Sequence, residues 1–197
     1  MENKQRLSDN QHIIPNGLLG MIFMISVEIM FFSGLISGYV VNRAEKPGAW
    51  DTPWNHILPV EQTLINTILL LVSAITIFIS FFIMMKKRDT TKSRIFLILT
   101  FVLGLFFVIL QGREWIDLIN YGLTTTSSIF GAFFYTIIGA HGIHVIFGLG
   151  ILTYIYFKIS RKNIQPEEKS FSILVGSLYW YFVVFLWPIL YYLVYLS

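Results

Sequence analysis

Three side chains within otherwise apolar segments could do acid–base chemistry: Glu28, His141 and His144. Glu28 lies about ten residues into an apolar run, which places it roughly 15 Å deep in a helix that rises about 1.5 Å per residue. An ionised carboxylate is expensive at that depth, so we expect Glu28 to face other protein groups. It is then either a neutral acid that donates a hydrogen bond or the partner of a cationic or donor group on another helix.

The two histidines are the expected partners of Glu28. They are three residues apart in a second apolar run, and this spacing puts both imidazoles on one face of a helix. A buried carboxyl–imidazole unit could carry or relay a proton, because ionisable groups inside membranes usually mark pathways. The same contact could instead be a hydrogen bond that only joins two helices, and the sequence leaves both interpretations open.

Metal chemistry is the third possibility for these residues. Two imidazoles and a carboxylate could ligate zinc or iron. Two imidazoles one helical turn apart, however, cannot occupy both axial positions of one haem. The sequence has no cysteine, which excludes disulfides, iron–sulfur clusters and thiolate metal sites. We therefore expect no catalytic residue, no metal site and no cofactor on this chain.

A second polar cluster ends the third apolar run. It contains Gln111, Glu114 and Trp115, together with Arg113 and Asp117. Opposite charges near a membrane surface can pair or extend toward water, so we interpret this cluster as a local ion-pair anchor.

The elements that position these residues are membrane-spanning helices. Hydrophobic residues make up 55% of the 197 residues and charged residues 13%, with a mean hydropathy of +0.69. A helix satisfies its own backbone in lipid, whereas an isolated strand does not. We expect an all-α integral membrane five-helix bundle, with residues 1–17 as a polar tail and residues 18–197 as one transmembrane domain. The five apolar runs are approximately 18–41, 64–85, 95–119, 128–157 and 171–196.

Polar and aromatic residues suggest how the helices are held. Asn66, Thr67, Ser73 and Thr76 give the second span hydrogen-bonding capacity toward neighbouring helices. In the last span, Trp180, Trp187 and the tyrosines 179, 181, 191, 192 and 195 look like anchors at the membrane surface. Trp50 and Trp54, in the long connection 42–62, fit a cap at headgroup level.

Basic residues alternate between the two ends of the predicted bundle. Because most of the 14 Lys and Arg residues fall on one side, the positive-inside rule places the N-terminus in the cytoplasm and the C-terminus outside. These basic residues lie mostly in short connections between apolar runs, which argues against nucleic-acid binding. The residues on the basic side are Lys4 and Arg6, then Lys86, Lys87, Arg88, Lys92 and Arg94, then Lys158, Arg161, Lys162 and Lys169.

Five sequence blocks covering nearly the whole chain resemble subunit III of the haem-copper oxidases. They are SVEIMFFSGLISGY around Glu28, LINTILLLVSAIT at 64–76, LQGREW at 110–115, FGAFFYTIIGAHGIHVIFG at 130–148 and YWYFVVFLW at 179–187. The fourth block is the most specific. Five spans match the short bacterial form of cytochrome c oxidase subunit III, which lacks two leading helices.

The resemblance implies residue roles and a fold. Glu28 would be the family's buried helix carboxylate, and His141 and His144 its histidine pair. Gln111, Glu114 and Trp115 would be its third-span signature. The family's helices form two groups around a lipid-filled cleft. The last block departs from the usual pattern, because Tyr181 and Val184 stand where a histidine and an aspartate are expected.

The resemblance also implies partners and a place in the cell. The chain would be a non-catalytic subunit of a proton-pumping terminal oxidase in the bacterial cytoplasmic (inner) membrane. It would bind beside catalytic subunit I, which holds the haems and copper, and alongside other oxidase subunits, with membership of a respiratory supercomplex left open. There it would support proton uptake and enzyme integrity while binding phospholipid. Alternatives are a subunit III of a quinol oxidase, an accessory subunit of a nitric oxide reductase and, more remotely, a proton-coupled transporter.

Overall fold

The computed structural model describes residues 15–45, 48, 50 and 58–196, and the regular structure within them is helical. All five of its long helices are long and apolar enough to cross a membrane, which confirms the predicted all-α class and number of spans. Each helix extends a few residues beyond the predicted run. They are α2 (Asn16–Glu45), α3 (Val60–Lys87), α4 (Thr90–Asn120), α5 (Ile129–Ser160) and α6 (Pro166–Tyr191), which a π-helical turn, η3 (Tyr192–Leu196), continues.

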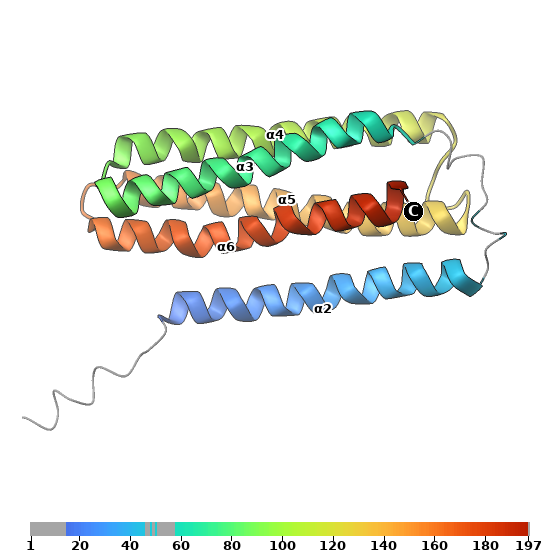
Figure 1. Cartoon of the computed structure of the whole chain (residues 1–197), viewed down its shortest axis with the longest axis horizontal. Coiled ribbons are helices and arrows are strands. Elements are labelled where there is room, and N and C mark those ends of the chain that lie inside the picture. The colour runs from blue at the N-terminus through green and yellow to red at the C-terminus, as the bar shows by residue number, and fades with distance from the viewer. Residues whose placement is uncertain (1–14, 46–47, 49, 51–57, 197) are drawn as a thin grey trace, which may run out of the picture.

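Four helices form a bundle, and the fifth lies beside it. Helix α3 packs against α4 and α6, and α5 packs against the same two helices from the other side. Helix α2 runs alongside, in contact with α6 and α5 (Figure 1). Only Phe32 and Tyr39 of α2 are buried. The two predicted helix groups are therefore α3–α6 and the single helix α2.

The helix ends follow ordinary capping chemistry. Arg88, at φ 50°, ends α3 in the left-handed region, and Asp89 then begins α4 by accepting the backbone N–H of Lys92 at 3.0 Å. This hydrogen bond holds the pKa of Asp89 below its usual value. Ser128 caps α5 in the same way, accepting the backbone N–H of Gly131 at 3.0 Å. The short connection at Arg88 and Asp89 turns the chain back, so α3 and α4 pack side by side as antiparallel neighbours.

The core of the bundle is built around two tryptophans of α6. Trp180 donates its indole N–H to Ser73 at 3.0 Å, and Trp187 donates to Thr67 at 2.8 Å. Both indoles are fully buried, so the prediction that they anchor the helix at the membrane surface is wrong. An indole can lie inside an apolar bundle when a hydroxyl meets its N–H, and α3 supplies both hydroxyls. The predicted hydrogen-bonding role of the second span is thus confirmed.

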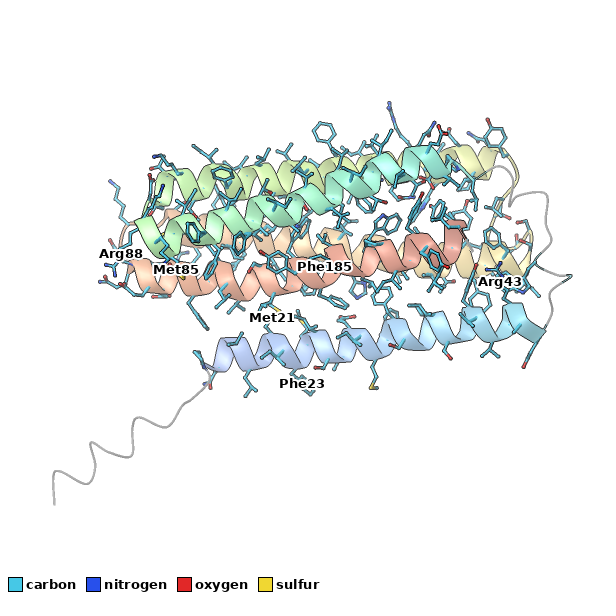
Figure 2. All side chains as sticks on the ribbon, in the orientation of Figure 1. Met21, Phe23, Arg43, Met85, Arg88 and Phe185 are labelled. Atoms are coloured by element: carbon cyan, nitrogen blue, oxygen red, sulfur yellow. The ribbon has the colours of Figure 1, made fainter. Side chains whose placement is uncertain are left out.

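Charged residues gather at the ends of the helices. Arg88 and Met85 lie at the end where α2 begins, whereas Arg43 lies at the opposite end (Figure 2). Arg88 forms an ion pair with Glu167 at 2.6 Å, which links the α3–α4 connection to the start of α6. Trp50 is buried against Tyr39 near the end of α2 and Phe133 near the start of α5. The proposed tail lies outside the described residues up to position 14, as does Trp54.

Candidate functional site

Phe32 fixes how α2 lies on the bundle. Its ring is 1% exposed and packs edge-on against His144 of α5, with 5.0 Å between the ring centroids, and against Phe182 of α6 at 6.4 Å. In Figure 2, Met21 lies on the side of α2 that faces the bundle and Phe23 on the far side. Glu28 precedes Phe32 by one helical turn, so it shares the face turned toward α5.

Glu28 and His144 meet between α2 and α5. The carboxylate oxygen Oε2 of Glu28 lies 2.7 Å from Nε2 of His144, and Nδ1 of His144 lies 2.6 Å from the backbone oxygen of Ala140. The hydroxyl of Tyr179 reaches the backbone oxygen of His144 at 3.4 Å. The Glu28–His144 contact joins residues 116 positions apart and forms a polar link between α2 and α5.

The hydrogen bonds around His144 determine how many protons the pair holds. A carbonyl oxygen only accepts, so Nδ1 of His144 carries a hydrogen and donates it to Ala140. One further proton must then lie between Nε2 and the carboxyl of Glu28. Either a carboxylic acid donates to a neutral imidazole, or an imidazolium donates to a carboxylate. The pair is neutral overall in both states, which suits a site inside hydrocarbon, and the two states differ only in the position of one proton.

His141 does not join this pair. Its side chain is 1% exposed and stacks on the indole of Trp187, with 4.9 Å between centroids and 29° between planes. Neither ring nitrogen has a hydrogen-bond partner among the described residues. His141 and His144 therefore lie on one helix, as predicted, but of the two only His144 contacts Glu28. The described residues contain no group of three or more His, Asp or Glu side chains able to hold a metal ion.

Glu114 is the centre of a second buried network. It accepts a short hydrogen bond from the hydroxyl of Tyr195 in η3, and its other oxygen lies 2.8 Å from the hydroxyl of Thr63 in α3. Gln111 donates to the same tyrosine oxygen at 3.1 Å, and Asn66 donates to Gln111 at 3.3 Å. The network thus joins α3, α4 and the last turn of the chain.

Proton counting shows how Glu114 is accommodated. The hydroxyl of Thr63 lies 3.0 Å from the backbone oxygen of Pro59 as well as close to Glu114, but it has only one hydrogen to donate. The backbone N–H of Thr63 already donates to that Pro59 oxygen at 3.0 Å, so the hydroxyl can donate to Glu114. The hydroxyls of Thr63 and Tyr195 then supply hydrogen bonds to both oxygens of the enclosed carboxyl, which lowers the cost of burying it.

The prediction of an ion-pair anchor at this position is wrong. Among the described residues, none of the ion pairs involves Arg113, Glu114 or Asp117. Gln111 and Glu114 are 4% and 6% exposed, because they point into the bundle. Tyr195 and Thr63, which complete the network, were not singled out as functional from the sequence. A tyrosine near a helix end is typical of a membrane surface, so no local signal marks its inward contact.

A groove separates α2 from α6. Its volume is about 350 Å³, and it is lined by Ile29, Phe32, Ser33 and Ile36 of α2 and by Tyr181, Phe182, Phe185, Leu186 and Ile189 of α6. Tyr181 is half-buried at the groove, and Val184 lies fully buried in the bundle. The two positions that depart from the family pattern therefore have different environments, one beside the groove and one in the core.

Comparison with known proteins points to one protein family. The family described as "Cytochrome c oxidase subunit III" matches residues 4–197 of the chain. A "Probable cytochrome c oxidase subunit 3" of Mycobacterium leprae (strain TN) is 34% identical over 177 residues, covering 90% of this chain and 86% of the relative.

Two further relatives extend the match to other bacteria. A "Cytochrome c oxidase subunit 3" of Corynebacterium diphtheriae is 32% identical over 171 residues, covering 86% of this chain and 82% of the relative. The protein of the same name from Bacillus subtilis (strain 168) is 31% identical over 184 residues, covering 92% and 86%.

Proposed function

The chain belongs to the cytochrome c oxidase subunit III family, and from this premise we propose that it is an accessory, non-catalytic subunit of a haem-copper terminal oxidase. The observation that carries the proposal is the family match over residues 4–197, on a chain with five helices able to cross a membrane in its described part. The resemblance noted in the sequence is confirmed at the level of the family.

Several features of the residues support a role beside a catalytic subunit. The chain has no cysteine, both ring nitrogens of His144 are engaged by the protein itself, and His141 is enclosed in the bundle. His144 is held by Glu28 and Ala140, and His141 is stacked on Trp187. Haems and copper are then held by a partner, catalytic subunit I, and this chain contributes packing surface and lipid contacts.

The Glu28–His144 pair is the candidate for a part in proton uptake. It holds one mobile proton at 2.7 Å between two groups of different chemistry, and 23% of the Glu28 side chain and 16% of the His144 side chain are exposed at the edge of the bundle. A pair that moves a proton without changing its net charge can respond to a neighbouring charge at small cost in lipid. In this proposal the pair supports proton delivery to the partner subunit.

The groove between α2 and α6 is the candidate lipid site. Its walls are apolar side chains from both helices, and α2 touches the bundle with little buried surface of its own. An acyl chain in this groove fills the space between α2 and α6, which stabilises the position of α2. Bound phospholipid and its contribution to the integrity of the complex are part of the proposal.

The electron donor is set by the partner subunits. The relatives are named as cytochrome c oxidase subunits, which favours cytochrome c as donor over a quinol, and favours an oxidase over a nitric oxide reductase. A free-standing proton-coupled transporter would use the same Glu28 carboxyl but would purify as a single chain.

Purification in mild detergent through a tag on this chain tests the proposal. We expect copper and haem of the a or o type to co-purify, and the preparation to consume oxygen with either reduced cytochrome c or a quinol, which identifies the donor. The matched control is an unrelated tagged protein with several spans, purified from the same membranes. A colourless, monodisperse particle that contains this chain alone would refute the assignment as an oxidase subunit.

A further inference from the structure

An apolar groove lies between α4 and α5, toward the end of the bundle that carries Arg88 (Figure 2). Its volume is about 180 Å³, and it shares no lining residue with the groove between α2 and α6. Ile98 and Phe157 line it and are 46% and 64% exposed, so the groove faces the hydrocarbon region of the membrane. The other lining residues are Leu97, Phe101, Leu152, Thr153 and Tyr156.

The guanidinium of Arg94 stands at one end of this groove. Arg94 precedes Leu97 and Ile98 of the lining by about one helical turn. Its Nη2 donates to the hydroxyl of Tyr156 at 2.7 Å, and its guanidinium carbon lies 4.9 Å from the centre of the Tyr156 ring. The hydrogen bond and the cation–π contact together hold the guanidinium beside the groove.

Arg94 is half-buried and has no acidic partner among the described residues. Its Nε is enclosed without a partner, whereas Nη1, which also makes no hydrogen bond to the described residues, is not enclosed. Arg94 thus offers one accessible donor and a positive charge that no described carboxylate balances. The described carboxylates at this end of the bundle pair with other cations: Asp89 with Lys92, Glu167 with Arg88, and Glu168 with Lys158.

The position of Arg94 along α4 matches the depth of lipid headgroups. Helix α4 has 31 residues, so it is about 46 Å long and, when centred, extends about 8 Å beyond each side of a hydrocarbon core about 30 Å thick. Arg94 lies about 6 Å along the helix from Thr90, in the headgroup region, whereas Phe101 lies about 16 Å along it, in hydrocarbon. A lipid whose phosphate meets Arg94 therefore has its acyl chain at the depth of the groove.

The charge of Arg94 and the walls of the groove define the chemistry of the ligand. A guanidinium is a strong partner for phosphate oxygens. A zwitterionic headgroup brings its own cation and leaves the charge of Arg94 unbalanced, whereas an anionic headgroup balances it. A dry cavity of about 150 Å³ holds the six carbons of benzene, so a groove of about 180 Å³ accommodates a similar stretch of an acyl chain.

Other basic residues at this end lack this combination. Arg161 also has no carboxylate partner among the described residues, but it is exposed and does not line the groove. A charge in water is screened and needs no specific counterion. Arg161 is therefore a suitable control for effects that depend only on the charge of this end of the bundle.

We propose that the groove between α4 and α5 binds an acyl chain of an anionic phospholipid, with Arg94 binding the lipid phosphate. This site is separate from the lipid contact proposed between α2 and α6. It lies wholly on this chain, so it does not depend on the assignment as an oxidase subunit.

Photolabelling tests this proposal. The particle purified in mild detergent through a tag on this chain is mixed with a phosphatidylglycerol that carries a diazirine in one acyl chain, irradiated, and its labelled peptides are mapped by mass spectrometry. We expect labels on residues 97–101 of α4 and 152–157 of α5. Unlabelled phosphatidylglycerol should compete at about tenfold lower concentration than phosphatidylcholine. The mapping is read in the same way whether or not haem and copper co-purify.

Variants at Arg94 test the headgroup contact. Arg94→Gln removes the charge and should abolish the preference for phosphatidylglycerol, whereas Arg94→Lys keeps the charge and should retain most of it. Arg161→Gln removes an exposed charge near the same end and should behave as the parent does. An unchanged preference in Arg94→Gln, or an equal loss in Arg161→Gln, would contradict the proposal.

Variants at Thr153 test the groove. Thr153→Phe places a ring among the lining residues and should abolish labelling of both segments. Thr153→Ser keeps the hydroxyl that donates to the backbone oxygen of Leu149 and leaves the groove open, so it should label as the parent does. Labels spread evenly over the lipid-facing helices, or equal competition by the two lipids, would overturn the proposal. If Arg94→Gln does not fold, the preference of the parent and the two Thr153 variants still decide it.

Discussion

At the scale of single residues, the carboxyls of Glu28 and Glu114 are held by hydrogen bonds and not by ion pairs with Lys or Arg among the described residues. Glu28 shares one proton with His144, and Glu114 lies among the hydroxyls of Thr63 and Tyr195. The Glu28–His144 pair has no net charge wherever its shared proton lies, which keeps the cost of an acid inside a membrane protein low. The two carboxyls differ in exposure: Glu28 lies at the edge of the bundle, whereas Glu114 is enclosed.

The Glu28 carboxyl can be tested by two substitutions of similar size. In Glu28→Gln the amide can still donate to Nε2 of His144, so we expect assembly to remain largely intact. In Glu28→Leu that nitrogen loses its partner, which should destabilise the contact between α2 and α5 by about 1–3 kcal/mol. The yield of assembled complex and its oxygen consumption measure the difference. Equal assembly and equal turnover in both variants would show that the carboxyl has no important role.

The Glu114 network depends on a tyrosine in the last turn of the chain. Tyr195→Phe removes the hydroxyl that Glu114 accepts from and that Gln111 donates to, leaving two buried groups short of a partner. We expect thermal unfolding in detergent to show a loss of about 1–3 kcal/mol. Tyr192→Phe is the matched control, because Tyr192 is 63% exposed in the same turn. Equal stability of the two variants would mean that the hydroxyl network contributes nothing.

For the Glu28–His144 pair, the sequence predicted the candidate residues but did not determine which of them are in contact. Glu28 and its partner on α5 followed from depth and helical spacing, because few ionisable groups lie in apolar runs. The choice of His144 over His141 could not be made, since the two are only one turn apart and the rotation of α5 decides it. Tyr195 was missed because its partner lies 81 positions away and is reached only through the packing of η3.

At the scale of helices, close approach of α6 to its neighbours depends on glycines facing tryptophans. Gly104 of α4 and Gly148 of α5 both lie against the ring of Trp180, which Ser73 of α3 holds by its N–H. One indole therefore contacts three helices. The long apolar runs predicted the helices, but the partner of each glycine depends on how the helices are rotated.

Gly104→Ala tests this packing. A Cβ at Gly104 would lie 2.5 Å from Cη2 and 2.8 Å from Cζ2 of Trp180, and the indole cannot move away without losing its hydrogen bond to Ser73. We expect a loss of about 1–3 kcal/mol in stability from overpacking. In the control Gly34→Ala the new methyl group meets no atom within 4 Å, so stability should be unchanged or slightly higher. A neutral Gly104→Ala would show that α4 and α6 can separate freely at this point.

At the scale of the whole molecule, charge is distributed unequally between the two ends of the bundle. The α3–α4 and α5–α6 connections lie at the same end as the start of α2, and most basic residues of the sequence belong to that end (Figure 1). The arrangement of helices thus agrees with the alternation of basic residues between the two ends of the bundle that the sequence predicted. The direction of the bundle in the membrane is a separate question, because it depends on insertion and not on packing.

Cysteine labelling can determine that direction, and the chain is well suited to it because it has no cysteine of its own. Asn163→Cys and Thr125→Cys each introduce one exposed thiol, in the α5–α6 and α4–α5 connections respectively. Since basic loops stay in the cytoplasm, a membrane-impermeant maleimide should label Thr125→Cys in intact spheroplasts and Asn163→Cys only in inside-out vesicles. The reverse pattern would place the N-terminus outside and would put the basic end of the bundle on the wrong side for the positive-inside rule.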